Sequence, residues 1–282
     1  MKASLIGSAL LVGLSVTAEA VIISADSFLV GANPAAGEYT ATQITGQGPT
    51  TLGYTGSWLN GNATATVTSS GLSYPGLETS GGALLAASGG SREGRLLATP
   101  VTATTAGTFY LSLLLKLSNA TGGNYKAFEM HNGGFTDATQ RSLQIGQGGT
   151  GTDFAGTTNF GLRLFSNDAF RVDLGPADTN VNLFVVRVDL STTNNADVIT
   201  VYRNPSSLTT EPAVPNGTLT GFNLMLDRAS AANFQANGDS ITVDEIRIGD
   251  SYTSVLPLVP EPSASLLMLL GSALGVARRR RL

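Results

Sequence analysis

Residues 182–190 read NLFVVRVDL, and this stretch decides the fold class. The even-numbered positions from Phe184 to Val188 are apolar, whereas the odd-numbered positions become charged at Arg187 and Asp189. Side chains of a β-strand point alternately to its two faces, so the pattern gives one strongly apolar face and one face that turns polar. The stretch is therefore predicted to be a strand with one face on a hydrophobic core.

The surrounding sequence carries further strand and turn signals. Residues 191–197 (STTNNAD) favour a turn and lead into VITVY at residues 198–202, as in a β-hairpin. Five more strands are predicted, at residues 108–117, 125–131, 160–165, 222–227 and 240–248. The glycine-rich residues 146–156 have no periodicity and are predicted to form a loop. Because no helical periodicity is sustained, residues 21–258 are predicted to be all-β, folded as a single β-sandwich.

Residues 259–282 have a three-part organisation of their own. They open with a short motif that comprises Val259, Pro260, Glu261, Pro262 and Ser263. An apolar run follows at residues 264–277, and the basic end comprises Arg278, Arg279, Arg280 and Arg281. As a helix the run spans roughly 21 Å, which is less than the ~30 Å hydrocarbon core of a bilayer. Transient membrane insertion with the arginines in the cytoplasm is predicted, and a permanent tail anchor is the alternative.

This tail resembles the PEP-CTERM sorting signal of Gram-negative bacteria, in its Pro-Glu-Pro motif, its apolar segment and its arginine cluster. The resemblance implies recognition by an exosortase-type processing enzyme at the membrane. It also implies export to the cell envelope, the outer surface or the extracellular matrix, commonly in bacteria that make extracellular polysaccharide. It implies nothing about the body of the protein.

The N-terminus has the features of a secretory signal peptide. Lys2 gives a positive start, residues 3–16 are apolar, and Ala18 and Ala20 form a small-x-small cleavage site. Cleavage after Ala20 would leave Val21 as the first residue, and a retained membrane anchor is the alternative. The chain is thus divided into a signal peptide at residues 1–20, a sandwich domain at 21–258 and a sorting signal at 259–282.

Composition excludes several classes of function. The chain of 282 residues has a net charge of −4, one histidine and no cysteine. Without Lys2 and the four terminal arginines its 16 basic residues become 11, and without Glu19 its 20 acidic residues become 19. An acidic body of this kind repels nucleic acid and anionic lipid, so neither is an expected partner. The absence of cysteine excludes disulfides and thiolate metal sites.

Residues 182–205, together with VDEIRIGDSY at 243–252, resemble the jelly rolls of concanavalin A-like lectins and laminin-G domains. The resemblance covers residues from about 25 to 256 and rests on a strand–hairpin–strand unit and a late Asp-Glu-Ile-Arg-Ile strand. It implies a jelly-roll sandwich. Proteins of this fold bind sugars, hydrolyse sugars or serve as rigid modules, so the fold alone does not select a function.

The sequence is predicted to have no catalytic residues. Glucanases of the resembled architecture carry two carboxylates on one strand in a Glu-x-Asp-x-(x)-Glu arrangement, which is absent here. Asp244 and Glu245 are adjacent and are expected to point to opposite faces of a strand. The single histidine, His131, sits at the end of a predicted strand, and the sequence contains no Gly-x-Ser-x-Gly motif. The glutamates of the body are scattered along the chain, at Glu38, Glu78, Glu93, Glu129, Glu211 and Glu245.

Two kinds of binding site are considered. Calcium is bound by loop oxygens, and the nearest cluster of suitable residues is Asn237, Asp239 and Asp244. Sugars stack on exposed aromatic rings, for which Trp58 and Tyr125 are the candidates, although Trp58 is also read as a core residue. No other cofactor is expected. The sequence thus predicts an exported, non-enzymatic structural or adhesive protein. A carbohydrate-binding lectin-like module is the alternative. A glycoside-active enzyme is the third possibility, and it would have to be a hydrolase whose carboxylates are distant in the sequence.

Overall fold

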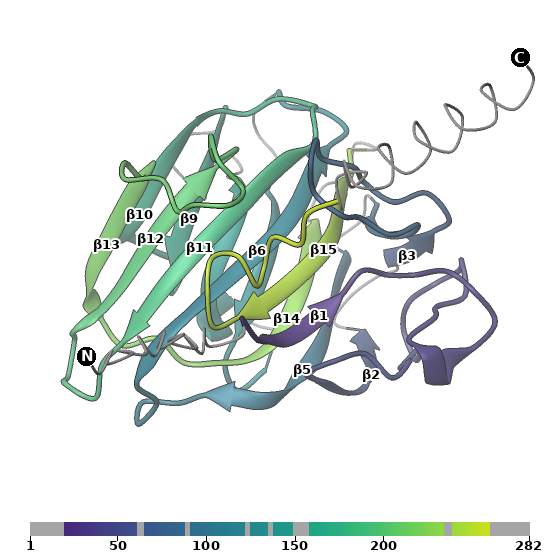
Figure 1. Ribbon diagram of the computed structural model, residues 1–282, viewed down its shortest axis with the longest axis horizontal. Coiled ribbons are helices and arrows are strands. Elements are labelled where there is room, and N and C mark those ends of the chain that lie inside the picture. Colours follow the sequence, from purple (N-terminus) through teal and green to yellow (C-terminus); the bar gives the residue numbers. More distant parts are fainter. Residues whose placement is uncertain are drawn as a thin grey trace, which may run out of the picture.

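The computed structural model describes residues 20–60, 65–87, 91–121, 125–134, 138–148, 158–233 and 239–259. Over these ranges the chain forms two antiparallel sheets that face each other as a β-sandwich, as predicted (Figure 1). The helices within the described ranges are two short 3-10 turns, η1 (Pro34–Ala36) and η2 (Ala138–Gln140). Among the described residues, no helix is long and apolar enough to cross a bilayer. Ala18, Asn237 and the sorting residues from Pro260 onward lie outside the described ranges.

The first sheet has eight strands, with β11 near its middle. The order across the sheet is β13 (Gly217–Phe222), β12 (Asp197–Arg203), β11 (Asn182–Leu190), β6 (Gly107–Leu117), β15 (Ile241–Gly249), β4 (Ala83–Ala86) and β3 (Ala65–Thr68). The eighth strand, β1 (Ile22–Asp26), also pairs with β15.

The second sheet has seven strands and covers the inner face of the first. Its order is β10 (Asn167–Pro176), β9 (Asn159–Leu164), β8 (Arg141–Gln147), β7 (Lys126–His131), β14 (Leu226–Asn233), β5 (Ser91–Val101) and β2 (Tyr54–Asn60).

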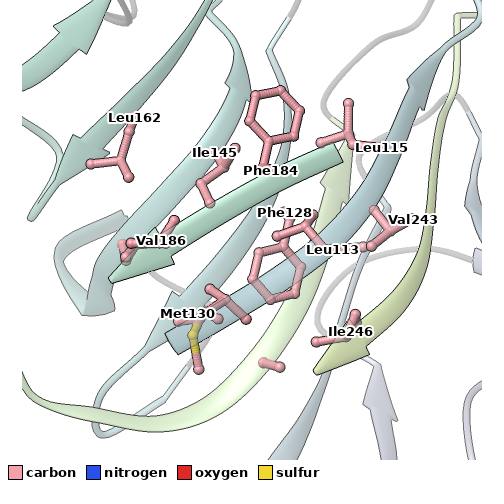
Figure 2. Close-up of a cluster of buried hydrophobic side chains, with 14 of the residues drawn as sticks. Leu113, Leu115, Phe128, Met130, Ile145, Leu162, Phe184, Val186, Val243 and Ile246 are labelled. Atoms are coloured by element: carbon pink, nitrogen blue, oxygen red, sulfur yellow. The ribbon is translucent and has the colours of Figure 1, made fainter. Parts of the chain in front are cut away.

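The core is built by the alternation that the sequence displays. In β11 the side chains of Phe184 and Val186 are fully buried, and they lie among Phe128 and Met130 of the facing sheet (Figure 2). Val186 is paired with a residue of β12 on one side and of β6 on the other, which places β11 between two apolar neighbours. The buried face predicted from NLFVVRVDL is thus confirmed.

Six of the seven predicted strands are present to within about a residue at each end, as β6, β7, β9, β11, β12 and β15. The strand predicted at residues 222–227 is wrong, because β13 ends at Phe222 and β14 begins at Leu226. Between them, the Leu224 N–H donates to the Asp197 carboxylate at 2.7 Å, which fixes a connection there.

The predicted loop at 146–156 is wrong at its start. Gly146 and Gln147 belong to β8, and residues 149–157 lie outside the described ranges. A Cβ atom on Gly146 would lie 2.1 Å from the Lys126 carbonyl oxygen of β7. This glycine therefore permits a close approach of two strands rather than marking a turn.

The segment after β15 packs on the outer face of the eight-stranded sheet. Tyr252 and Val255 are buried against Tyr110 of β6, and the segment ends in a bridge between Leu258 and Leu77. The described body thus stays packed up to the start of the predicted sorting motif.

Candidate functional site

A charged cluster lies on the outer face of the seven-stranded sheet. Glu129 alternates with the core residue Phe128 in β7, so its side chain points away from the core. Its carboxylate lies 3.1 Å from the Arg92 Nε atom, 2.8 Å from the Arg141 Nε atom and 2.9 Å from the His131 Nε2 atom. Three strands, β5, β7 and β8, therefore bring their charged groups to one carboxylate.

This environment keeps Glu129 ionised. Burial raises the pKa of its carboxyl group, but the hydrogen bond with His131 and the charges of Arg141 and Arg92 lower that pKa to about 2. The Tyr125 hydroxyl also donates to Glu129, at 2.5 Å. A carboxylate with this pKa has no proton to give at neutral pH, so Glu129 can act as an anchor for cations but not as a general acid.

A second pair of carboxylates lies at a bulge in β15. Glu245 has a φ of 50°, and the register with β6 shifts between Asp244 and Arg247. Asp244 Oδ2 accepts a hydrogen bond from the Leu72 N–H at 2.7 Å, and Glu245 accepts one from the Ser80 N–H at 2.5 Å. Both carboxylates therefore face the segment that precedes β4.

The expectation that Asp244 and Glu245 point to opposite faces is thus wrong, because the bulge interrupts the alternation of the strand. Burial and then the charge of Glu245 raise the pKa of Asp244 to about 8, although the Leu72 N–H lowers it. Asp244 and Glu245 are each at most 1% exposed. They are held inside the protein, where a substrate has no access.

A groove of about 630 Å³, with a mixed polar and apolar lining, lies on the outer face of the eight-stranded sheet, across β3, β4, β6 and β15. Lys116 contributes an ammonium group to it. Six hydroxyl side chains line it, those of Thr68, Ser70, Ser118, Thr179, Ser240 and Thr242. Hydroxyls both donate and accept hydrogen bonds, so the groove offers hydrogen-bond partners to a hydroxyl-rich ligand.

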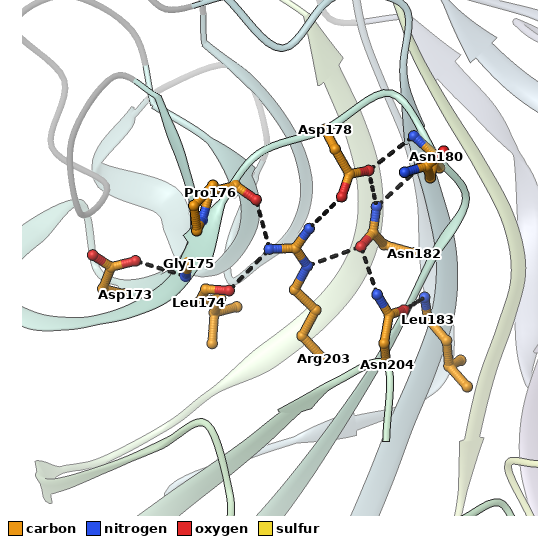
Figure 3. Close-up of polar contacts among 10 residues, drawn as sticks. All are labelled: Asp173, Leu174, Gly175, Pro176, Asp178, Asn180, Asn182, Leu183, Arg203 and Asn204. Atoms are coloured by element: carbon orange, nitrogen blue, oxygen red, sulfur yellow. Dashed lines mark hydrogen bonds and ion pairs between the residues drawn. The ribbon is translucent and has the colours of Figure 1, made fainter. Parts of the chain in front are cut away.

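Two side chains, those of Asp244 and Arg203, hold the walls of the groove. On one side, Asp244 holds the backbone of Leu72, which lines the groove. On the other, Thr179 belongs to a connection held by Arg203, whose guanidinium lies 2.8 Å from the Asp178 carboxylate and donates to the Asn182 side chain (Figure 3). Arg203 also donates to the backbone carbonyls of Leu174 and Pro176, so the connection is tied at both ends (Figure 3).

A separate apolar pocket of about 230 Å³ lies between the sheets, near the connection of β5 and β6. Its walls include Leu97, Phe109, Met130 and Leu226. Among the described residues that line it, the polar side chains are hydroxyls, those of Ser24, Thr99, Thr105 and Thr108, and none is a carboxylate, histidine, lysine or arginine.

The two predicted aromatic platforms are in the interior. Trp58 is 1% exposed, packs on Phe28 and donates through Nε1 to the Tyr39 hydroxyl at 2.9 Å. Tyr125 is 4% exposed and lies under the Arg141 guanidinium, 4.9 Å from the ring centre. Neither ring has the exposed face that stacking on a sugar requires, so the platform prediction is corrected for both, and the reading of Trp58 as a core residue holds.

The predicted calcium residues are not assembled into a site. Asn237 lies outside the described ranges. Asp239 lies 3.4 Å from the Lys126 ammonium and accepts from the Asn119 amide, whereas Asp244 accepts backbone N–H groups in another part of the protein. Over the residues that the structure describes, no group of three or more acidic or histidine side chains is placed to hold a metal ion.

Sequence reasoning missed both polar sites. The clue to the charged cluster was the outward alternation of Glu129 and His131 with Phe128 and Met130 in KAFEMH. The only sequence signals for the groove are the alternating hydroxyl residues of TVTS at 66–69 and SIT at 240–242, and these look like ordinary strand and turn residues. Its assembly depends on which strands are neighbours, and a single sequence does not reveal that.

No protein-family model matches the chain, and no curated protein matches its sequence. Among solved structures, the chain is similar to a carbohydrate esterase of the Shiga toxin-encoding bacteriophage phi24B, at 12% identity over 82% of this chain and 99% of that one, with a TM-score of 0.48. It is also similar to botulinum neurotoxin type C, whose cell entry depends on two ganglioside molecules, at 10% identity over 82% and 50% of the chains and a TM-score of 0.40.

A third similar structure is the binding domain of botulinum neurotoxin DC in complex with SialylT, at 9% identity over 76% and 49% of the chains and a TM-score of 0.42. This chain spans about half the length of the toxin structures. At these identities and scores the likeness concerns the arrangement of strands alone.

Proposed function

We propose that this chain is exported and sorted by a PEP-CTERM system to the envelope or extracellular matrix of a Gram-negative bacterium. There its body, a jelly-roll sandwich of the concanavalin A-like type, serves as a non-enzymatic structural or adhesive module. The pattern of the two chain ends supports the sorting. An exosortase-type enzyme is the proposed processing partner.

The observation that carries the adhesive role is the groove lined by six hydroxyl side chains. Its walls are held by Asp244 and Arg203 before any ligand arrives, which reduces the entropy lost on binding. Its chemistry fits the hydroxyls of a polysaccharide. A lectin-like module is the second candidate, and it would use the same groove with higher affinity.

The carboxylates of the body support a non-enzymatic role. Glycoside hydrolysis requires one carboxylic acid that is protonated and one carboxylate that attacks or activates water, both in contact with the sugar. Glu129 stays ionised among its arginines, and the raised-pKa group Asp244 is buried under the segment that precedes β4. Neither is placed to meet a sugar together with a partner.

Intact mass of the native protein, recovered separately from envelope and culture medium, tests the sorting. We expect a chain that begins at Val21 and ends near Pro262. A chain that continues to Leu282 in both fractions would contradict processing and would make the protein a membrane-tethered surface protein.

Binding of the exported protein to the polysaccharide of its own envelope tests the adhesive role. Thr242→Val should weaken binding about two- to tenfold, because each hydrogen bond contributes about 0.5–1.5 kcal/mol. Thr220→Val is the matched control, because Thr220 is an exposed residue of β13 on the same sheet but outside the groove. Equal binding by both variants would remove the groove as the contact. Turnover of the polysaccharide that one carboxylate substitution abolishes would overturn the non-enzymatic role.

A further inference from the structure

Val21 lies at the start of the described fold, immediately before β1, and both of its backbone groups contact Asp250. The Val21 nitrogen donates to the Asp250 Oδ1 atom at 2.9 Å, and the Asp250 N–H donates back to the Val21 carbonyl at 3.1 Å. These residues are 229 positions apart in the chain. The pair thus ties the beginning of the folded body to the end of β15.

The Asp250 carboxylate has one partner in this arrangement. Among the described residues, the Val21 N–H is the only hydrogen-bond donor to its side chain, and no side-chain cation is paired with it. A carboxylate that faces a single backbone amide has unused capacity to accept further hydrogen bonds and a positive charge.

The sequence places the predicted export cleavage at this same nitrogen, after Ala20. We propose that Asp250 is the binding site for the new N-terminus, so that cleavage converts the Val21–Asp250 hydrogen bond into an ion pair. This inference rests on the export part of the proposed function and adds a role for a residue outside the groove.

The chemical change is a hydrolysis. Water adds across the Ala20–Val21 peptide bond, the Ala20 carbonyl carbon becomes a carboxylate on the released peptide, and the Val21 nitrogen becomes an ammonium. The nitrogen then has three N–H donors and a positive charge where it had one neutral donor. Before cleavage a neutral amide N–H donates to the carboxylate at 2.9 Å. After cleavage both partners are charged, so the attraction of an exposed ion pair is added to the hydrogen bond.

The consequence is a more firmly attached edge strand. Only part of β1 is in regular register with β15, because the pairing shifts between Ile22 and Ser24. The Val21–Asp250 hydrogen bonds lie at this irregular end of β1. Processing therefore strengthens the pairing where the strand ladder is weakest, and it does so only in chains that have been cut at the correct bond.

Labelling of the α-amine tests the proposal on the full chain, expressed with its own export signal and recovered after export. The wild type is compared with Asp250→Asn, which keeps the shape and one acceptor oxygen but removes the charge. The ion pair raises the pKa of the α-amine above its ordinary value of about 7.7–8.0, so less free amine is present at pH 7.5. We expect acylation of Val21 to be roughly two- to fivefold slower in the wild type, as for an exposed ion pair.

A geometric control moves the charge. Insertion of Gly-Ser between Ala20 and Val21 carries the new ammonium about 7 Å outward, and the dependence on Asp250 should then disappear. Intact mass identifies the first residue in every sample.

The outcomes separate this inference from the export proposal. A chain that begins at Val21 and reacts equally fast with and without Asp250 overturns the ion pair and leaves export standing. A chain cut at another bond overturns the inference alone. A chain that keeps Met1 overturns both.

Discussion

Glu129 and Asp244 are both fully buried, one on each sheet, but at neutral pH the first is ionised and the second keeps its proton. Glu129 has its pKa lowered to about 2, whereas Asp244 has its pKa raised to about 8. Burial acts in the same direction on both, since it disfavours the charged form. The difference comes from the partners that the fold brings to each carboxylate.

Glu129 receives side-chain donors from three strands, including two guanidinium groups. Asp244 receives two backbone N–H groups, and the bulge in β15 places a second carboxylate, that of Glu245, beside it. Two neutral donors do not offset desolvation and a nearby negative charge. The comparison shows that the cations supplied by neighbouring strands, rather than depth, account for the different charge states of these two buried carboxyl groups.

The largest expected effect comes from removing the anchor of the ionised site. Glu129→Leu leaves the buried Arg92 and the partly buried Arg141 without their shared carboxylate and should lower the free energy of unfolding by about 3–5 kcal/mol. Urea denaturation measures this effect. Glu78→Gln, on an exposed glutamate, is the control and should stay within about 0.5 kcal/mol of wild type. A similarly small change for Glu129→Leu would contradict the role of Glu129 as the shared partner of the two arginines.

The second prediction concerns the stability profile between pH 5 and 8. Asp244 keeps its proton in the folded state up to pH about 8, whereas an unfolded aspartate loses it near pH 3.8. The folded state therefore binds more protons between these values, and the free energy of unfolding falls as pH rises, by at most about 1.4 kcal/mol per pH unit from this group. Asp244→Asn should flatten the profile between pH 5 and 8, as followed by denaturation at several pH values. An unchanged slope would show that Asp244 is ionised.

The third prediction concerns the acid side. The pKa of Glu129 lies below the ordinary 4.5, so its contribution to stability is present above pH 4.5 and is lost as pH falls toward 2. Glu129→Gln should remove this acid dependence, of at most about 1.4 kcal/mol per pH unit, while leaving the slope between pH 5 and 8 intact. If Asp244→Asn and Glu129→Gln changed stability over the same pH range, the pKa values of the two carboxyl groups would not be shifted in opposite directions.

The smallest effect is expected inside the Asp244 site. Glu245→Gln removes the neighbouring negative charge and should lower the pKa of Asp244, because that charge is the second cause of its rise. Burial, the first cause, remains, so the pKa should stay above its ordinary value. Carboxyl ¹³C chemical shifts followed over pH measure the change. A pKa that rises on removal of Glu245 would contradict the arrangement at the bulge.

The strands that sequence reasoning found are those whose alternation is long and apolar. The hairpin of β11 and β12 is the clearest, because one face of Asn182–Leu190 must be buried wherever its neighbours lie. Most of the strands it missed are short or glycine-bearing, such as β8, where Gly146 looks like a turn residue until the β7 backbone is placed beside it. Their assignment depends on a neighbour that is distant in the chain.

The candidate functional residues show the same dependence on tertiary structure. Trp58 and Tyr125 have aromatic rings that could stack on sugars, but residue type does not reveal exposure, and both side chains are buried. Asp244 and Glu245 were expected on opposite faces because alternation is the default for a strand, and a bulge at Glu245 overrides that default.

By itself, the sequence determined the all-β class, the central hairpin and the composition that excludes disulfides, because alternation and residue counts are local properties. Only the tertiary structure decided which carboxylates are charged, which hydroxyls share a groove and that Asp250 lies at the Val21 nitrogen. Each of these depends on contacts between strands far apart in the chain. The electrostatic and hydrogen-bond energies that matter act over a few ångströms in space, whatever the separation in sequence.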